Sequence, residues 1–163
     1  MASRDYSVEE QRLLLDKLAI REVLDQYWYG LGHHDIDAVL DAFSDDAHYS
    51  TASGKDEIRA IVERISGLRC INILCGSQRI EINDDTASAD TQAIAFLVIE
   101  GSEPERLLLQ GLRYVDRLER TDSGWRIVDR GGLEDRTIAH DISFQFELVS
   151  RPVDLLDELD RSS

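Results

Sequence analysis

The cluster His33-His34-Asp35 contains the residue types of a general base. A neutral imidazole can accept a proton, and a neighbouring carboxylate can orient the ring. Asp35 can instead cap a following helix, which would leave both histidines in an exposed loop. A metal site would need a third ligand, and none is nearby in the sequence. The cluster therefore predicts either a base at the mouth of a pocket or an exposed loop and helix cap.

Three consecutive aromatic residues, Tyr27-Trp28-Tyr29, could form the wall of an apolar pocket. In a helix they would span nearly the whole circumference, so at most two of the rings can face one cavity. Packing in an ordinary core is the alternative interpretation of that inward pair.

A second group of charged residues lies near the end of one expected strand. We interpret it as cross-strand pairs of opposite charge on an exposed face, rather than as an anion site. The group comprises Arg113, Asp116, Arg117, Glu119, Arg120 and Arg126.

The composition argues against several partners. The chain of 163 residues has 18 Lys and Arg against 33 Asp and Glu, a net charge of -15 that would repel nucleic acid and anionic membrane surfaces. Cys70 and Cys75 should point to opposite faces of one strand, so neither a disulfide nor a zinc site is expected. With reduced thiols and no apolar signal core near the N-terminus, we expect a cytoplasmic protein.

The hydrophobic pattern predicts helices first and strands afterwards. Ser7 and Glu10 form a capping box, so a long helix should begin at Val8, and Gly30 and Gly32 should end it. Its expected buried stripe is Leu14, Leu18, Val23, Leu24, Tyr27, Trp28 and Leu31. The further helices are expected from the Asp35 cap to residue 42 and at 56–65, and the strands at 47–51, 69–82, 87–100, 106–120 and 125–138.

These elements predict an α+β domain in which the helices cover one face of a mainly antiparallel sheet. Gly131-Gly132 suggests a bulge that curves the sheet around a cavity. One domain is expected over 1–163, with its core at about 8–140 and tails at 1–6 and 150–163. In the second tail, the segment from Pro152 could form a short amphipathic helix that packs on the body or on a second subunit.

This order of elements, with the motifs Phe43-Ser44-Asp45-Asp46-Ala47-His48-Tyr49 and Trp125-Arg126-Ile127, resembles the SnoaL-like, nuclear transport factor two-like family. The resemblance implies a cystatin-like cone, in which the sheet is strongly curved and encloses one apolar pocket. The layout is similar to that of scytalone dehydratases and hexachlorocyclohexane dehydrochlorinases. Those enzymes use an aspartate and a histidine as an acid/base pair, and the matching positions here are Gly32 and Leu74.

The resemblance also implies roles for several other residues. Tyr49 matches a pocket aromatic that orients water or substrate. Arg130 matches a pocket arginine that can stabilise developing negative charge, provided that a bulge turns it inward. Tyr27, Trp28, Asn72 and Leu74 match pocket-lining positions.

Two hypotheses follow from these observations. In the first, the protein is a cofactor-independent lyase, dehydratase or isomerase for a small, mostly apolar or aromatic cyclic molecule, with Tyr49, Arg130 and His33 as its catalytic residues. In the second, the Asp/His pair is lost and the protein is a ligand-binding or structural subunit, similar to the small subunit of ring-hydroxylating dioxygenases. Under both hypotheses we expect a homodimer or larger homo-oligomer, because both faces of the strand at 106–120 carry apolar residues.

Overall fold

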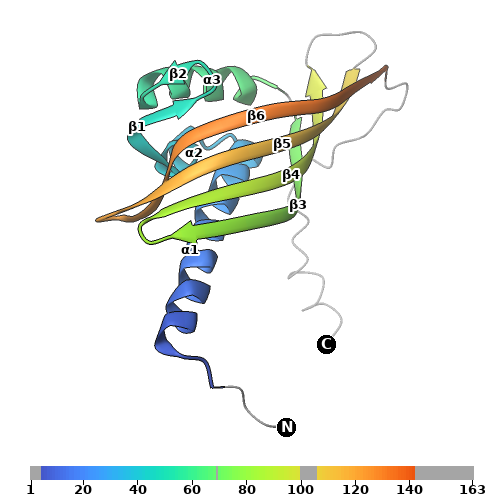
Figure 1. Ribbon diagram of the computed structural model, residues 1–163. Coiled ribbons are helices and arrows are strands. Elements are labelled where there is room, and N and C mark those ends of the chain that lie inside the picture. The colour runs from blue at the N-terminus through green and yellow to red at the C-terminus, as the bar shows by residue number, and fades with distance from the viewer. Residues whose placement is uncertain (1–4, 69, 100–105, 142–163) are drawn as a thin grey trace, which may run out of the picture.

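The structure of the protein is a computed structural model that describes residues 5–68, 70–99 and 106–141, with side chains described for 5–68, 71–98 and 106–132. Helices precede most of a six-stranded sheet, whose strand order is β2-β1-β6-β5-β4-β3 (Figure 1). This arrangement confirms the predicted α+β class. The elements are α1 (Val8–His33), α2 (Ile36–Asp41), β1 (Phe43–Tyr49), β2 (Ala52–Ser53), α3 (Lys55–Ser66), β3 (Cys70–Asn83), β4 (Thr86–Ile99), β5 (Arg106–Thr121) and β6 (Gly124–Asp141).

The capping box at the start of α1 is confirmed. The Ser7 hydroxyl accepts a hydrogen bond from the Glu10 backbone N–H at 3.1 Å, and the Glu10 carboxylate accepts one from the Ser7 N–H at 2.8 Å. The predicted end of the helix was too early, because α1 continues through Gly30 and Gly32 to His33. It ends where His34 adopts the left-handed conformation with φ of 57°.

Gly30 serves the contact between α1 and α2 rather than a helix end. A Cβ atom at this position would lie 2.7 Å from a Val39 side-chain methyl group and 2.9 Å from the Asp35 carbonyl oxygen. Glycine therefore lets the two helices approach closely. The Asp35 carboxylate accepts a hydrogen bond from the Ala38 N–H at 3.0 Å, which confirms it as the cap of α2.

Strands β3 to β6 form an antiparallel meander, as their short turns predict. The sheet is nevertheless mixed, because β1 pairs with β6 in parallel, with Phe43 opposite Ile127 and Tyr49 opposite Arg130. This pairing, which the sequence pattern did not predict, brings the first strand beside the last.

The buried stripe of α1 covers only its C-terminal part. Leu24, Tyr27, Trp28 and Leu31 are buried as expected, whereas Leu14 and Leu18 are 47% and 56% exposed. Figure 1 shows the reason, since the N-terminal part of α1 extends past the edge of the sheet. The prediction that the stripe is buried from Leu14 onward was wrong for these two leucines.

Within the described residues, no helix is both long enough and apolar enough to span a bilayer. The tail at 150–163 and the side chain of Cys70 lie outside the described residues, and the side chain of Cys75 is exposed.

The outer face of the sheet carries exposed apolar side chains. Leu74 on β3 lies opposite Ile94 on β4 in the strand register, and Ile94 is 47% exposed. We expect this face to mediate self-association, because burying apolar surface is favourable. Light scattering at micromolar concentration should report at least twice 18.5 kDa, and Ile94→Glu should lower the measured mass. A monomeric wild-type protein would refute the expectation.

Candidate functional site

The geometry of β6 turns Arg130 inward. In the β5–β6 register Arg117 pairs with Asp129 and Leu118 with Ile127, so Val128 is an extra residue on β6. This bulge places Ile127 and Arg130 on the same, inner face of the sheet, where both side chains are fully buried. The sequence predicted an inward Arg130 only if a bulge at Gly131-Gly132 turned it, and the bulge that does so instead precedes Arg130, at Val128.

Asp116 on β5 neutralises the buried guanidinium. Arg130 Nε donates to Asp116 Oδ1 at 2.6 Å and Nη2 donates to Oδ2 at 2.8 Å, a bidentate pair in which both side chains are buried. Burial is the largest influence on the pKa of Arg130 and disfavours the charge. The charge and hydrogen bonds of Asp116 outweigh this effect and raise the pKa above its ordinary value. The side chain is therefore a permanent cation.

Aromatic rings surround the same guanidinium. Its Cζ atom lies 3.9 Å from the centre of the Tyr27 ring, 5.1 Å from that of Tyr114, 5.3 Å from that of Trp28 and 5.7 Å from that of Phe43. The π faces of aromatic rings attract cations, and the attraction is stronger when the cation has lost its water. We call Arg130, Asp116 and these four aromatic residues, together with Tyr49, the arginine cluster.

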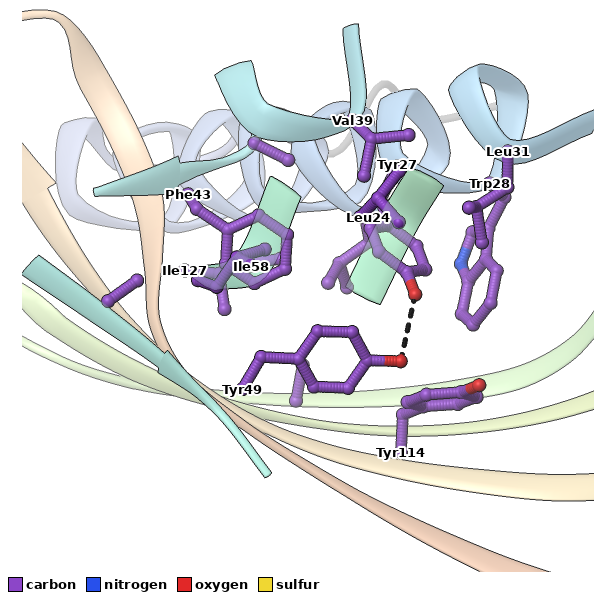
Figure 2. Close-up of a cluster of buried hydrophobic side chains, with 14 of the residues drawn as sticks. Leu24, Tyr27, Trp28, Leu31, Val39, Phe43, Tyr49, Ile58, Tyr114 and Ile127 are labelled. Carbon is purple, nitrogen blue, oxygen red and sulfur yellow. Dashed lines mark hydrogen bonds between the residues drawn. The ribbon is translucent and has the colours of Figure 1, made fainter. Parts of the chain in front are cut away.

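Tyr49 joins the cluster through its hydroxyl group. In Figure 2, Tyr49 and Tyr114 reach from the strands toward Tyr27 and Trp28 on α1, and the hydroxyls of Tyr27 and Tyr49 share a hydrogen bond at 3.1 Å. Tyr49 is buried on the side of Ala47, whereas His48 is exposed, as strand alternation predicts. Burial, with smaller contributions from neighbours that include Tyr49, raises the pKa of both Tyr27 and Tyr114, so these phenols remain protonated donors.

Three buried polar atoms near the cluster have no hydrogen-bond partner among the described residues. They are Arg130 Nη1, Trp28 Nε1 and the hydroxyl oxygen of Thr91, which lies opposite Tyr114 in the β4–β5 register. Each carries an N–H or O–H that can donate. A ligand with an acceptor oxygen could satisfy such groups, whose burial without a partner is costly.

Two hollows in the surface border the cluster. One, of about 320 Å³, lies between the end of α1 and β3 and is lined by Trp28, Tyr29, Gly32, His33, Ile71, Asn72 and Ile73. The other, of about 290 Å³, is lined by Tyr49, Ser50, Thr51, Ile61, Arg64, Leu112, Tyr114 and Gly132. We call them the α1 hollow and the Tyr49 hollow. Trp28 of the first contacts Tyr114 of the second edge to face, with ring centres 4.9 Å apart.

His33 lines the α1 hollow, as expected of a base at the mouth of a pocket, and its side chain is exposed, as expected of a residue in a loop. Asp35 caps α2 and does not orient the imidazole. Instead His33 Nδ1 lies 2.8 Å from the backbone carbonyl oxygen of Tyr29, and the ring stacks on the Tyr29 ring with centres 3.9 Å apart. The described residues contain no group of three or more His, Cys, Asp or Glu suited to a metal ion.

Two of the pocket-lining expectations on β3 have different outcomes. Asn72 borders the α1 hollow, but it is exposed and shares strand parity with Leu74. Leu74 is 59% exposed, and strand alternation puts it on the outer face, opposite to Ile71 and Ile73, which pack against the core. The expectation that Leu74 lines the pocket does not fit this placement. Its neighbour Ile73 lies on the inner face of β3 and lines the α1 hollow instead.

Gly32 lies where a longer side chain would have room. A Cβ atom there would meet only the Ile71 carbonyl oxygen, at an ordinary contact distance of 3.6 Å. The glycine is thus not required by packing, and the α1 hollow lacks a carboxylate at this point because of the residue type alone.

Sequence reasoning missed Asp116, which it assigned to the exposed charge ladder. The expected ladder is correct for Arg113, which pairs with Asp90 at the surface. Asp116 differs because it shares strand parity with Tyr114 and Leu118, which are buried on the inner face. The burial of Asp116 could have been predicted from this shared parity.

The pair can be tested by its effect on stability. Asp116→Ala should leave the Arg130 charge buried without its partner and lower the free energy of unfolding by about 3–5 kcal/mol. Asp90→Ala removes the matched surface pair and should cost no more than about 1 kcal/mol. Urea unfolding of both variants measures the difference. Equal losses would contradict the description of Arg130 and Asp116 as a desolvated pair.

Comparison with known proteins agrees with this fold. The SnoaL-like domain profile matches residues 12–131. Three solved structures resemble the chain: a candidate aromatic ring hydroxylase from Novosphingobium aromaticivorans (22% identity, 78% of this chain and 94% of that chain covered, TM-score 0.72), a candidate scytalone dehydratase from the same organism (19%, 79% and 90%, 0.68), and a hexachlorocyclohexane dehydrochlorinase from Novosphingobium barchaimii (17%, 80% and 97%, 0.64). At these identities they share the fold alone. No curated protein matches the sequence. The profile match covers most of the chain, and the protein therefore belongs to the SnoaL-like domain family.

Proposed function

We propose that this protein is a cofactor-independent lyase or isomerase that acts by acid/base chemistry on a small, mostly apolar cyclic molecule. The hydrogen bond that fixes the His33 tautomer is the observation that carries the proposal. The family match and the resemblance to structures described as a dehydratase and a dehydrochlorinase support the reaction class.

The tautomer follows from the partner of Nδ1. A backbone carbonyl oxygen can only accept, so His33 Nδ1 must donate its proton to the Tyr29 oxygen at 2.8 Å. The lone pair of the neutral ring then lies on Nε2, which has no hydrogen-bond partner among the described residues. Stacking on Tyr29 restrains the ring. In the proposal, Nε2 removes a proton from a substrate in the α1 hollow, with the rim of Trp28 as a further contact.

The arginine cluster provides the complementary charge. Proton removal next to a carbonyl group or a leaving group develops negative charge on the substrate, and prearranged donors stabilise it. Arg130 and the protonated phenols would supply a fixed cation and hydroxyl donors. Trp28 lines the α1 hollow and contacts Tyr114 of the Tyr49 hollow. In the proposal, rotation of the Trp28 indole lets a ligand contact His33 and the arginine cluster together.

The alternative is a binding or structural protein without catalysis. Two observations favour it: Gly32 and Leu74 cannot act as an acid/base pair, and the guanidinium of Arg130 is fully enclosed by its rings and Asp116. In this case the same hollow would bind a cyclic ligand that remains unchanged.

The base assignment predicts a loss of turnover when the imidazole is replaced. His33→Gln should remove at least about 99% of turnover, because a positioned general base contributes typically about 10²–10⁴-fold. The measurement is mass spectrometry of products from a panel of cyclic alcohols, ketones and chlorinated cyclohexanes.

His34→Gln is the matched control, since His34 Nδ1 lies 2.9 Å from the Ser66 carbonyl oxygen, away from the α1 hollow. This variant should retain most of the turnover. Equal rates for the wild type and His33→Gln would eliminate the base, and binding without any turnover would establish the alternative.

Tyr49 has a separate test. Tyr49→Phe removes the hydroxyl that bonds to Tyr27 and should lower stability by about 1 kcal/mol, the net value of a typical hydrogen bond. Affinity for a bound member of the panel should fall by about fivefold if the hydroxyl also contacts the ligand. Tyr6→Phe, outside both hollows, serves as the control for the affinity measured by titration calorimetry, and urea unfolding of Tyr49→Phe measures the loss of stability. Unchanged affinity in Tyr49→Phe would exclude Tyr49 from ligand binding.

A further inference from the structure

A further hollow lies apart from the arginine cluster and shares none of its residues. It has a volume of about 510 Å³ and lies between the N-terminal part of α1 and the edge strand β3. We call it the edge groove. Its lining combines apolar and cationic side chains, including Leu14, Lys17, Leu18 and Arg21 from α1 and Arg79 and Ile80 from β3.

Positive charge in the edge groove is unusual for this chain. The protein has a net charge of -15, yet three of its 18 basic residues line one hollow that contains no carboxylate. Arg79 bonds to Glu81 at 2.7 Å. Arg21 lies one helical turn from Asp25, and its positive charge opposes the rise that burial causes in the pKa of Asp25. Lys17 forms no ion pair with a carboxylate of the described residues. The groove thus has cationic side chains beside the exposed leucines of α1.

The chain itself contains a segment with the complementary composition. Residues 152–160, Pro-Val-Asp-Leu-Leu-Asp-Glu-Leu-Asp, carry four acidic side chains and no basic one. As a helix, the segment would place Leu155, Leu156 and Leu159 on one side, and Pro152 would suit its first turn. Nine helical residues are about 13 Å long, and the part of α1 from Leu14 to Arg21 is about 10 Å long.

The segment can also reach the groove. The last described residue of β6, Asp141, pairs with Arg106 at the end of the sheet where β3 begins. From there the groove is about 14 Å away across three strands and about 26 Å along β3, roughly 30 Å in all. The ten residues 142–151 can span about 33–36 Å when extended. The connection is long enough, with little excess.

We propose that residues 152–160 bind in the edge groove of their own chain, with their leucines against Leu14 and Leu18 and their carboxylates facing Lys17 and Arg21. The segment would cover the apolar part of α1 that extends past the sheet. This inference goes beyond the proposed function and does not depend on it.

The lysine content of the chain allows a direct test. Lys17 and Lys55 are its two lysines. Lys55 pairs with Asp45 at 2.9 Å and lies on α3, outside the groove. A carbodiimide joins an amine to a carboxylate only when the two groups are in contact. Treatment of the full chain should therefore link Lys17 to Asp154, Asp157, Glu158 or Asp160 with at least tenfold the yield of links from Lys55 to the same residues.

Mixing isotopically labelled and unlabelled chains identifies whose segment is bound. The proposal requires links within one chain, and links found only between labelled and unlabelled chains would overturn it in favour of a second copy. A Leu156→Asp, Leu159→Asp variant adds carboxylates but removes apolar contacts, so its link to Lys17 should fall at least fivefold. An undiminished link in this variant, or equal yields at Lys17 and Lys55 in the wild type, would show that no docking occurs.

Discussion

One charged group inside the core determines the arrangement around it. Bringing a guanidinium out of water costs several kcal/mol unless an opposite charge and hydrogen bonds compensate. Arg130 receives both from Asp116, and aromatic faces enclose the remaining surface. The compensating groups come from three elements: α1 supplies Tyr27 and Trp28, β1 supplies Phe43, and β5 supplies Asp116 and Tyr114. The ion pair therefore ties the long helix to three strands at one point of the cone.

The same arrangement separates two chemical tasks. The interior holds a permanent cation and protonated phenols, which can stabilise negative charge but cannot accept a proton. The imidazole lies at the margin, where a backbone carbonyl holds its tautomer. A reaction that needs both would take place where the margin meets the interior, at Trp28. This residue touches the α1 hollow, the guanidinium and Tyr114.

Local patterns predicted most of the elements, while pairings over long distances were not predictable. The capping box, the Asp35 cap and the four long strands depend on neighbouring residues, and the structure has them within a few residues of the predicted bounds. The bulge at Val128 has no glycine to indicate it, and yet it decides where Arg130 points. Leu74 shows the same sensitivity, because counting one residue differently along a strand moves a side chain to the other face. Leu14 and Leu18 fit the apolar periodicity of α1 and were therefore predicted to be buried. The periodicity of a helix does not show where the sheet beneath it ends, so their exposure could not be predicted.

The parallel pairing of β1 with β6 also orders events in time. Phe43 and Tyr49 leave the ribosome some eighty residues before their neighbours Ile127 and Arg130. Contacts that close such long loops form late and slowly. Before β6 is made, the rings of Tyr27, Trp28, Phe43 and Tyr49 lack the guanidinium that they enclose in the folded protein, and exposed apolar surface of this kind favours aggregation. The sheet is consequently completed by a strand that carries charge into the core.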